Sequence, residues 1–210
     1  MPRKRTLVTA GVLGAIIASL AIGQSKLSAS LAGQAVMAPY FEVDPLWPKP
    51  LPNGWLLGMT IGVGVDARDH VFIVHRGAET LNARTEGGYP LVGPCCSAAP
   101  PVLEFDPEGN LVNSWGGPGE GYTWPTSNHG IAIDHMNNVW IGGNGTPDST
   151  GKVGWDSHVL KFTHDGKFVK QIGVPGRRAD SKSMDAFGRV AKISFDAKAN
   201  EAYFADGYGN

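Results

Sequence analysis

Net charge of either sign is nearly absent from this sequence. Its 18 lysines and arginines are balanced by 19 aspartates and glutamates, which leaves a formal charge of −1 at pH 7. No basic patch interleaved with aromatic residues occurs, although that pattern is typical of nucleic-acid binders. We therefore expect no nucleic-acid partner.

Cysteine is scarce as well, because the sequence has two, the adjacent Cys95 and Cys96. No third cysteine and no suitably spaced histidine accompany them, which disfavours a metal site. In an oxidising compartment, neighbouring cysteines can form a vicinal disulfide, or each can pair with a partner elsewhere. We expect a structural, oxidised pair.

Long apolar runs are missing except near the N-terminus, where one extends from Leu7 to Ile22. Its length of about 16 residues is short of the roughly 20 that span a bilayer. Basic residues precede the run and small residues follow it, as in a cleavable export signal, and no cysteine follows that would indicate a lipoprotein. We predict that residues 1–35 are a signal peptide or, alternatively, an N-terminal anchor. The mature protein is then secreted or periplasmic, with no membrane contact beyond such an anchor.

The rest of the sequence is rich in turn residues, with 29 glycines and 15 prolines, as is usual for all-β proteins. Residues 129–173 contain four short runs of β-branched and aromatic residues, separated by Asp, Asn and Gly clusters. These runs are Ile131 to Ile133, Val139 to Ile141, Val159 to Phe162 and Phe168 to Ile172. Asp134 to Asn138 and His164 to Lys167 tolerate positive φ, so both predict tight reversals. We predict a four-stranded antiparallel sheet with no helix between its strands.

The same pattern is repeated before and after this stretch. Asp66, Asp134 and Asp196 mark equivalent points of three copies. Their spacing of about 60 to 70 residues exceeds the roughly 40 to 50 of a bare propeller blade, and inserted loops account for the excess. The predicted fold class is all-β, an incomplete β-propeller of about two and a half blades. We place a Pro/Trp-rich lead-in at 36–59, the propeller at 60–210, and the blades at about 60–116, 129–173 and 190–210.

The sequence ends at Asn210, just after the first hairpin of the third copy. An open half-propeller exposes sheet edges and faces that closure would cover. We expect the remaining blades to come from further C-terminal sequence, so that this chain is an N-terminal fragment. Self-assembly of half-rings is the alternative.

Several motifs carry a resemblance to a known family. The pattern HGIAID, NNVWI, HVLKF and DGKFVKQIG resembles a blade of the NHL-repeat propellers. More narrowly, VFIVHRG, NHGIAID and AYFADGYGN, in that order, resemble the six-bladed lyase domain of peptidylglycine α-amidating enzymes, the peptidylamidoglycolate lyase. The resemblance covers about residues 60–210. It implies a six-bladed NHL-type propeller that cleaves a peptidyl-α-hydroxyglycine to a peptide amide and glyoxylate, and hence a small-molecule or peptide substrate.

This resemblance implies roles for five residues. His129 matches a zinc-ligating histidine, and neutral imidazole is a common zinc ligand. Arg76 matches an arginine that holds the substrate carboxylate, and Tyr208 matches the tyrosine that takes a proton from the substrate hydroxyl. Val63 and Ile131 match positions whose backbone carbonyls hold a structural calcium ion. The family's other zinc histidines lie in later blades, so we expect this chain alone to be inactive.

Each assignment also has a structural alternative. His129 could line a channel and bond to backbone, Arg76 could pair with Glu79, and Tyr208 could belong to an ordinary turn. His75 could contact a metal or substrate. For the whole protein, the alternative function is a non-catalytic propeller that binds a ligand or another protein. The remaining histidines are expected to be solvated residues of turns and strand ends, namely His70, His135, His158 and His164.

Overall fold

The computed structural model describes residues 2–32, 38–81, 96–150, 154–177 and 179–208. The chain divides into two compact units, Met1–Asp44 and Pro45–Asn210. The regular structure of the first unit is one helix, α1 (Pro2–Ala32). Within the described ranges, no helix is both long enough and apolar enough to cross a membrane. The export signal stays a prediction.

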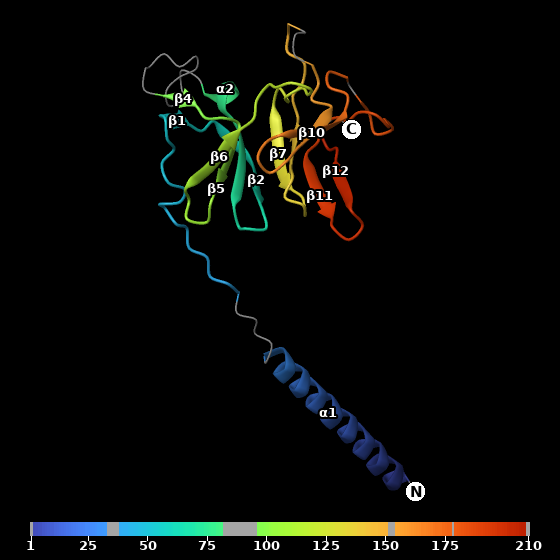
Figure 1. The fold of residues 1–210 in the computed structure, drawn as a ribbon. Coiled ribbons are helices and arrows are strands. Elements are labelled where there is room, and N and C mark those ends of the chain that lie inside the picture. The colour runs from blue at the N-terminus through green and yellow to red at the C-terminus, as the bar shows by residue number, and fades with distance from the viewer. Residues whose placement is uncertain (1, 33–37, 82–95, 151–153, 178, 209–210) are drawn as a thin grey trace. The chain divides into compact units, whose positions relative to one another are not determined.

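Strands dominate the second unit, which confirms the all-β prediction (Figure 1). One short helix, α2 (Gly77–Thr80), interrupts them. The strands are β1 (Trp55–Leu56), β2 (Met59–Val65), β3 (Val71–Arg76), β4 (Ser97–Ala98), β5 (Val102–Phe105), β6 (Leu111–Trp115), β7 (Asn128–Ile133), β8 (Val139–Gly143), β9 (His158–Phe162), β10 (Phe168–Gly173), β11 (Lys192–Asp196) and β12 (Glu201–Ala205).

Two four-stranded antiparallel meanders form the body of this unit. The first sheet has the order β2-β3-β5-β6, and the second has the order β7-β8-β9-β10, as predicted. Strands β11 and β12 form an antiparallel hairpin, and the short strands β1 and β4 pair in parallel. The two meanders share a register, because Phe72 pairs with Glu104 in the first and Trp140 pairs with Lys161 in the second. Glu104 and Lys161 therefore occupy equivalent positions.

The turns reverse the chain where their sequences predict it. Asp69, Asn137 and Asn200 have φ values of 60°, 59° and 55° in the first hairpin of each copy. Gly109 and Gly166 have φ values of 81° and 83° in the β5–β6 and β9–β10 turns. Residues of these types tolerate the left-handed region. Both reversals predicted for the second sheet are therefore confirmed.

The two meanders pack on one another through an apolar core. Its buried residues are Phe72, Val74, Val102, Ile131, Val139, Ile141, Leu160 and Phe162. The first strands of successive copies also adjoin, β2 against β7 and β7 against β11 (Figure 1). A glycine permits the first of these approaches, since a Cβ atom on Gly62 would lie 2.9 Å from the backbone nitrogen of Ile131. The first strands of successive copies are therefore neighbours.

The Pro/Trp-rich lead-in covers the other face of the first sheet. Trp47, Leu51 and Trp55 pack on the buried side chains of Ile73 and Phe105, among others. The ring centroids of Trp47 and Phe105 are 5.7 Å apart. The central strands of this sheet are consequently buried on both faces.

One cysteine of the adjacent pair, Cys96, lies within the described residues. Cys96 forms a disulfide, and none of the cysteines that the structure describes is free. Its oxidised state is as expected. Cys95 lies outside the described residues.

Candidate functional site

Arg76, His129 and Tyr208 come from three separate segments and lie at the same end of the sheets. Arg76 is the last residue of β3, and His129 is the second residue of β7. In antiparallel meanders, the end of a second strand lies beside the start of a first strand. Tyr208 follows β12 and so reaches this end from the third copy. The fold therefore brings the three predicted site residues together.

His129 and Tyr208 are in direct contact. The Tyr208 Oη lies 3.2 Å from the His129 Nε2, and the two rings meet edge to face with centroids 5.1 Å apart. Tyr208 is 45 % exposed, so a ligand can reach its hydroxyl. Burial, and next the positive charge of Arg76, lower the pKa of His129, while the backbone of Ala191 raises it to a lesser extent. A neutral His129 can accept the Tyr208 proton.

The guanidinium of Arg76 is held by neutral groups. Its Nε donates to the carbonyl of Asn128 over 3.1 Å, and its Nη2 donates to the Asn144 Oδ1 over 2.7 Å. The side chain of Glu79, its alternative partner, lies outside the described residues. Among the carboxylates that the structure does describe, none forms an ion pair with Arg76. An oriented guanidinium with donors to spare is suited to an anionic ligand.

Two further residues of this cluster were not predicted. Asn144 comes directly after β8, at the position of the second sheet that is equivalent to Arg76 in the first sheet. The register of the repeat could therefore have identified it. Arg189 donates from Nη2 to the Tyr208 carbonyl, and its Cζ lies 5.8 Å from the Tyr208 ring centroid. No motif in the sequence points to Arg189. It lies in an irregular segment that Asp206 fixes by accepting the backbone N–H groups of Gly188 and Arg189.

His75 has a structural role, which corrects its suggested contact with a metal or substrate. The ring is fully buried. Its Nδ1 accepts the Gly58 N–H over 3.2 Å, and its Nε2 donates to the Pro100 carbonyl over 2.9 Å. Both ring nitrogens are thus used by the backbone. Burial lowers the pKa of His75, so the ring is neutral.

Of the four histidines expected to be solvated, one is buried and two are only partly exposed. His158 is fully buried and its Nε2 donates to the Thr123 carbonyl over 2.7 Å. His70 and His164 are partly buried, and each lies within hydrogen-bond distance of a carboxylate at the opposite end of the sheets. Only His135 is exposed as expected. The sequence did not reveal these contacts because they join segments far apart along the chain.

Val63 and Ile131, the predicted calcium positions, line one pocket. It has a volume of about 130 Å³ and lies among β2, β7 and the segment at the start of β11. His129 and Ile193 also line it. The adjoining first strands thus place the two predicted positions near each other and near His129.

Fold and site together define a class, an all-β protein of meander sheets with a His-Tyr-Arg cluster at one sheet end. The sequence matches none of the protein-family models and none of the curated proteins with which it was compared. A function for this chain therefore has to rest on the chemistry of the site itself.

Proposed function

We propose that this protein is a lyase of the peptidylamidoglycolate type, which cleaves the C–N bond of an α-hydroxyglycine substrate to give an amide and glyoxylate. The observation that supports it is the 3.2 Å contact between the Tyr208 Oη and the His129 Nε2. Arg76 is close enough for its charge to lower the pKa of His129. In this proposal Tyr208 accepts a proton, His129 is its hydrogen-bond partner, and Arg76 beside them binds the substrate carboxylate.

The proposed scaffold is an exported, six-bladed propeller of the NHL type. Successive antiparallel meanders with adjoining first strands support it. In propellers, the inner ends of the blades surround a central channel, and loops at its mouth carry the site. In the proposed propeller, the cluster of Arg76, His129 and Tyr208 would lie at that mouth.

In the proposed reaction, Arg76 binds the carboxylate of the substrate and fixes the orientation of the α-carbon. The substrate hydroxyl gives its proton to the Tyr208 oxygen as Tyr208 passes its own proton to the His129 Nε2. The C–O bond becomes the carbonyl of glyoxylate, and the C–N bond breaks with its electron pair moving to nitrogen. That nitrogen takes the proton back from His129 by way of Tyr208, so no net proton is consumed.

The resemblance implies two metal ions, a catalytic zinc and a structural calcium, and the site residues fit them differently. A catalytic zinc ion needs about three protein ligands, yet the only group of three metal-ligating side chains within the described ranges does not include His129. Zinc therefore fits only in part, and we derive no step through it. Bound there, zinc would polarise the substrate oxygen. The proposed calcium ion would be structural, held by backbone carbonyls of Val63 and Ile131.

The proposal can be tested on the full-length protein, including the further blades expected for it, with an N-acyl-α-hydroxyglycine as substrate, zinc and calcium present and glyoxylate as the readout. We expect Tyr208→Phe to lower kcat by about 100-fold or more, as for loss of a general base. The matched control is Tyr203→Phe, because Tyr203 is an exposed tyrosine of β12. Equal rates for Tyr208→Phe and the wild type would refute the mechanism. Substrate binding that is weakened in Arg76→Gln, but without turnover in any variant, would favour the non-catalytic binding module.

A further inference from the structure

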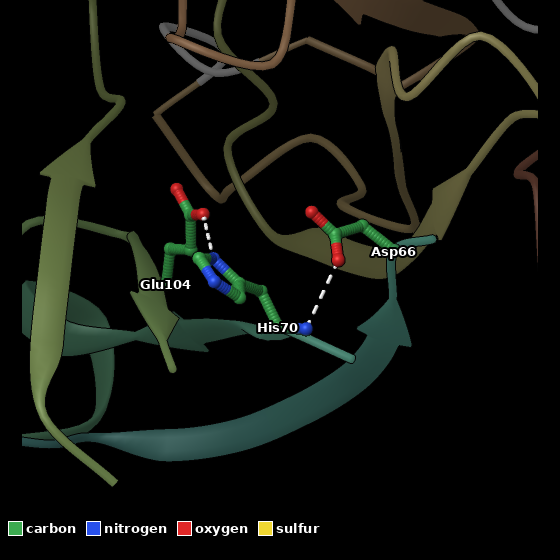
Figure 2. Close-up of side chains that lie close together, drawn as sticks. All are labelled: Asp66, His70 and Glu104. Carbon is green, nitrogen blue, oxygen red and sulfur yellow. Dashed lines mark hydrogen bonds and ion pairs between the residues drawn. The ribbon is translucent and has the colours of Figure 1, made fainter. Parts of the chain in front are cut away.

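A second cluster of ionisable residues lies at the opposite end of the sheets. It consists of Asp66, His70, Glu104 and His164, and we call it the Asp66 cluster. Figure 2 shows the His70 ring directed at the Glu104 carboxylate, with Asp66 accepting the His70 backbone N–H. The side chains of Asp66 and Glu104 are 0 % and 3 % exposed. Two carboxylates are therefore buried together, which is costly without a cation.

The second sheet shows one way of balancing the charge of the leading aspartate. There, the Lys161 Nζ lies 3.1 Å from the Asp134 Oδ2. Glu104 occupies the position equivalent to Lys161, and Asp66 the position equivalent to Asp134. The first sheet thus has a second carboxylate where the second sheet has its cation. A positive charge has to come from elsewhere.

Arg68 supplies a charge, but its contacts conflict with one another. Its Nη2 lies 3.3 Å from the Asp66 Oδ2, 3.5 Å from the Glu104 Oε1 and 2.7 Å from the His164 Nε2. The same Nε2 lies 3.0 Å from the Asp66 Oδ2. If Nε2 carries a proton, two donors face each other, and if it does not, its lone pair faces a carboxylate. No placement of the proton satisfies both neighbours, and the Arg68 side chain is 56 % exposed.

We propose that the Asp66 cluster is a binding site for a divalent transition metal of the zinc class, which takes the place of the Arg68 guanidinium. Its ligands are carboxylate oxygens of Asp66 and Glu104 and imidazole nitrogens of His70 and His164. One ligand atom each from Asp66, His70 and Glu104 lies within 4.8 Å of the others. Mixed nitrogen and oxygen donors suit zinc, whereas calcium and magnesium prefer oxygen alone.

The His164 Nε2 lies at ligand spacing from both carboxylates. Bonds of about 2.0 Å in a tetrahedron place neighbouring ligand atoms roughly 3.3 Å apart. The His164 Nε2 is 3.0 Å from the Asp66 Oδ2 and 3.3 Å from the Glu104 Oε1. The His70 Nδ1 is closer, 2.6 Å from that Oε1, so metal binding would move these two atoms apart. The His164 ring is further held edge to face against Phe72, with centroids 5.1 Å apart. Since His164 belongs to the second sheet, the metal would join the two sheets.

Titration of the metal-stripped 210-residue chain with Zn²⁺, and with Co²⁺ for its absorption spectrum, tests this site. Wild type and His129→Ala are both expected to bind, which separates this site from the proposed catalytic one. Glu104→Gln and His164→Gln should each weaken binding by more than about 100-fold, beyond the range typical for residues that only support a ligand. The control is His135→Gln, which removes an exposed histidine from the β7–β8 hairpin, the equivalent of β2–β3 in the second sheet. It should leave metal affinity unchanged.

Arg68→Gln separates a metal site from a charge-balanced structural cluster. If a metal displaces Arg68, removing that charge should tighten Zn²⁺ binding by about 10-fold or more. Zn²⁺ should also raise the melting temperature of the wild type but not that of Glu104→Gln, with circular dichroism reporting whether each variant is folded. Wild type that binds no metal through this cluster, with Arg68→Gln losing stability and gaining no affinity, would overturn the proposal.

Discussion

Buried histidines govern how single residues of this chain respond to pH. The pKa values of His75, His129 and His158 are all lowered, in each case chiefly by burial. Between the lowered pKa and the ordinary value of about 6.5, the unfolded chain binds more protons than the folded chain. We therefore predict that the free energy of unfolding falls as the pH is lowered through about 6.5. Urea titrations between about pH 8 and pH 5, with a chelator present, measure this.

Carboxylates act in a different pH window and do not obscure the effect. Burial raises the pKa values of Asp66 and Asp134, but hydrogen bonds outweigh it and hold both at about 2. Their contribution to stability is complete above the ordinary value of about 4 and is lost as the pH falls toward 2. His75→Gln should reduce the slope near pH 6, whereas the exposed His135→Gln should not. A flat profile would contradict the histidine argument.

At the scale of elements, the stability of a hairpin depends on the aspartate that precedes its turn. This contribution differs between Asp134 in β7–β8 and Asp196 in β11–β12. Asp134 accepts hydrogen bonds from the backbone of Met136 and Asn138 and from the Trp140 indole, and it pairs with Lys161. Charge-assisted bonds of this kind contribute roughly 1.5 to 3 kcal/mol. We predict that Asp134→Ala lowers the free energy of unfolding by about that amount in urea titrations.

Asp196 provides the matched control, because it leads the equivalent hairpin, β11–β12. Its Oδ1 accepts only the backbone N–H groups of Lys198 and Ala199, and the residue is exposed. Asp196→Ala should therefore cost roughly 0.5 to 1 kcal/mol, as for loss of an exposed cap. If both substitutions lower the free energy of unfolding equally, the bonds of Asp134 to Trp140 and Lys161 do not contribute to stability.

Elements of this kind are predictable from sequence because their signals are local. Alternating β-branched residues and Asp, Asn or Gly at the turns define the meanders of the second sheet, and the structure has them. The contact of Tyr208 with His129 was predictable only through a family resemblance. The meeting of His164 with Asp66, or of Arg189 with Tyr208, depends on how sheets pack together. No local pattern in the sequence records that.

For the molecule as a whole, the close approach of β2 to β7 fixes how the two meanders pack. A Cβ atom on Gly62 would lie 2.9 Å from the Ile131 nitrogen and 3.1 Å from the Gly130 Cα, both of them backbone atoms that cannot move aside. Gly62 does not have positive φ, so close contacts, and not the backbone conformation, oppose an alanine there. We predict that Gly62→Ala lowers the free energy of unfolding by about 1 to 3 kcal/mol, the usual cost of overpacking.

Gly64 is two residues along the same strand and offers the comparison. The nearest atom to its added Cβ is the Ile133 Cγ1 at 3.1 Å, which belongs to a side chain that can adjust by a few tenths of an ångström. Alanine also restricts the unfolded chain more than glycine does, which favours the folded state by about 0.4 to 1 kcal/mol. Gly64→Ala should therefore be close to neutral in the same urea titration. If the two variants unfold at the same midpoint, the close approach of β2 to β7 contributes little to stability.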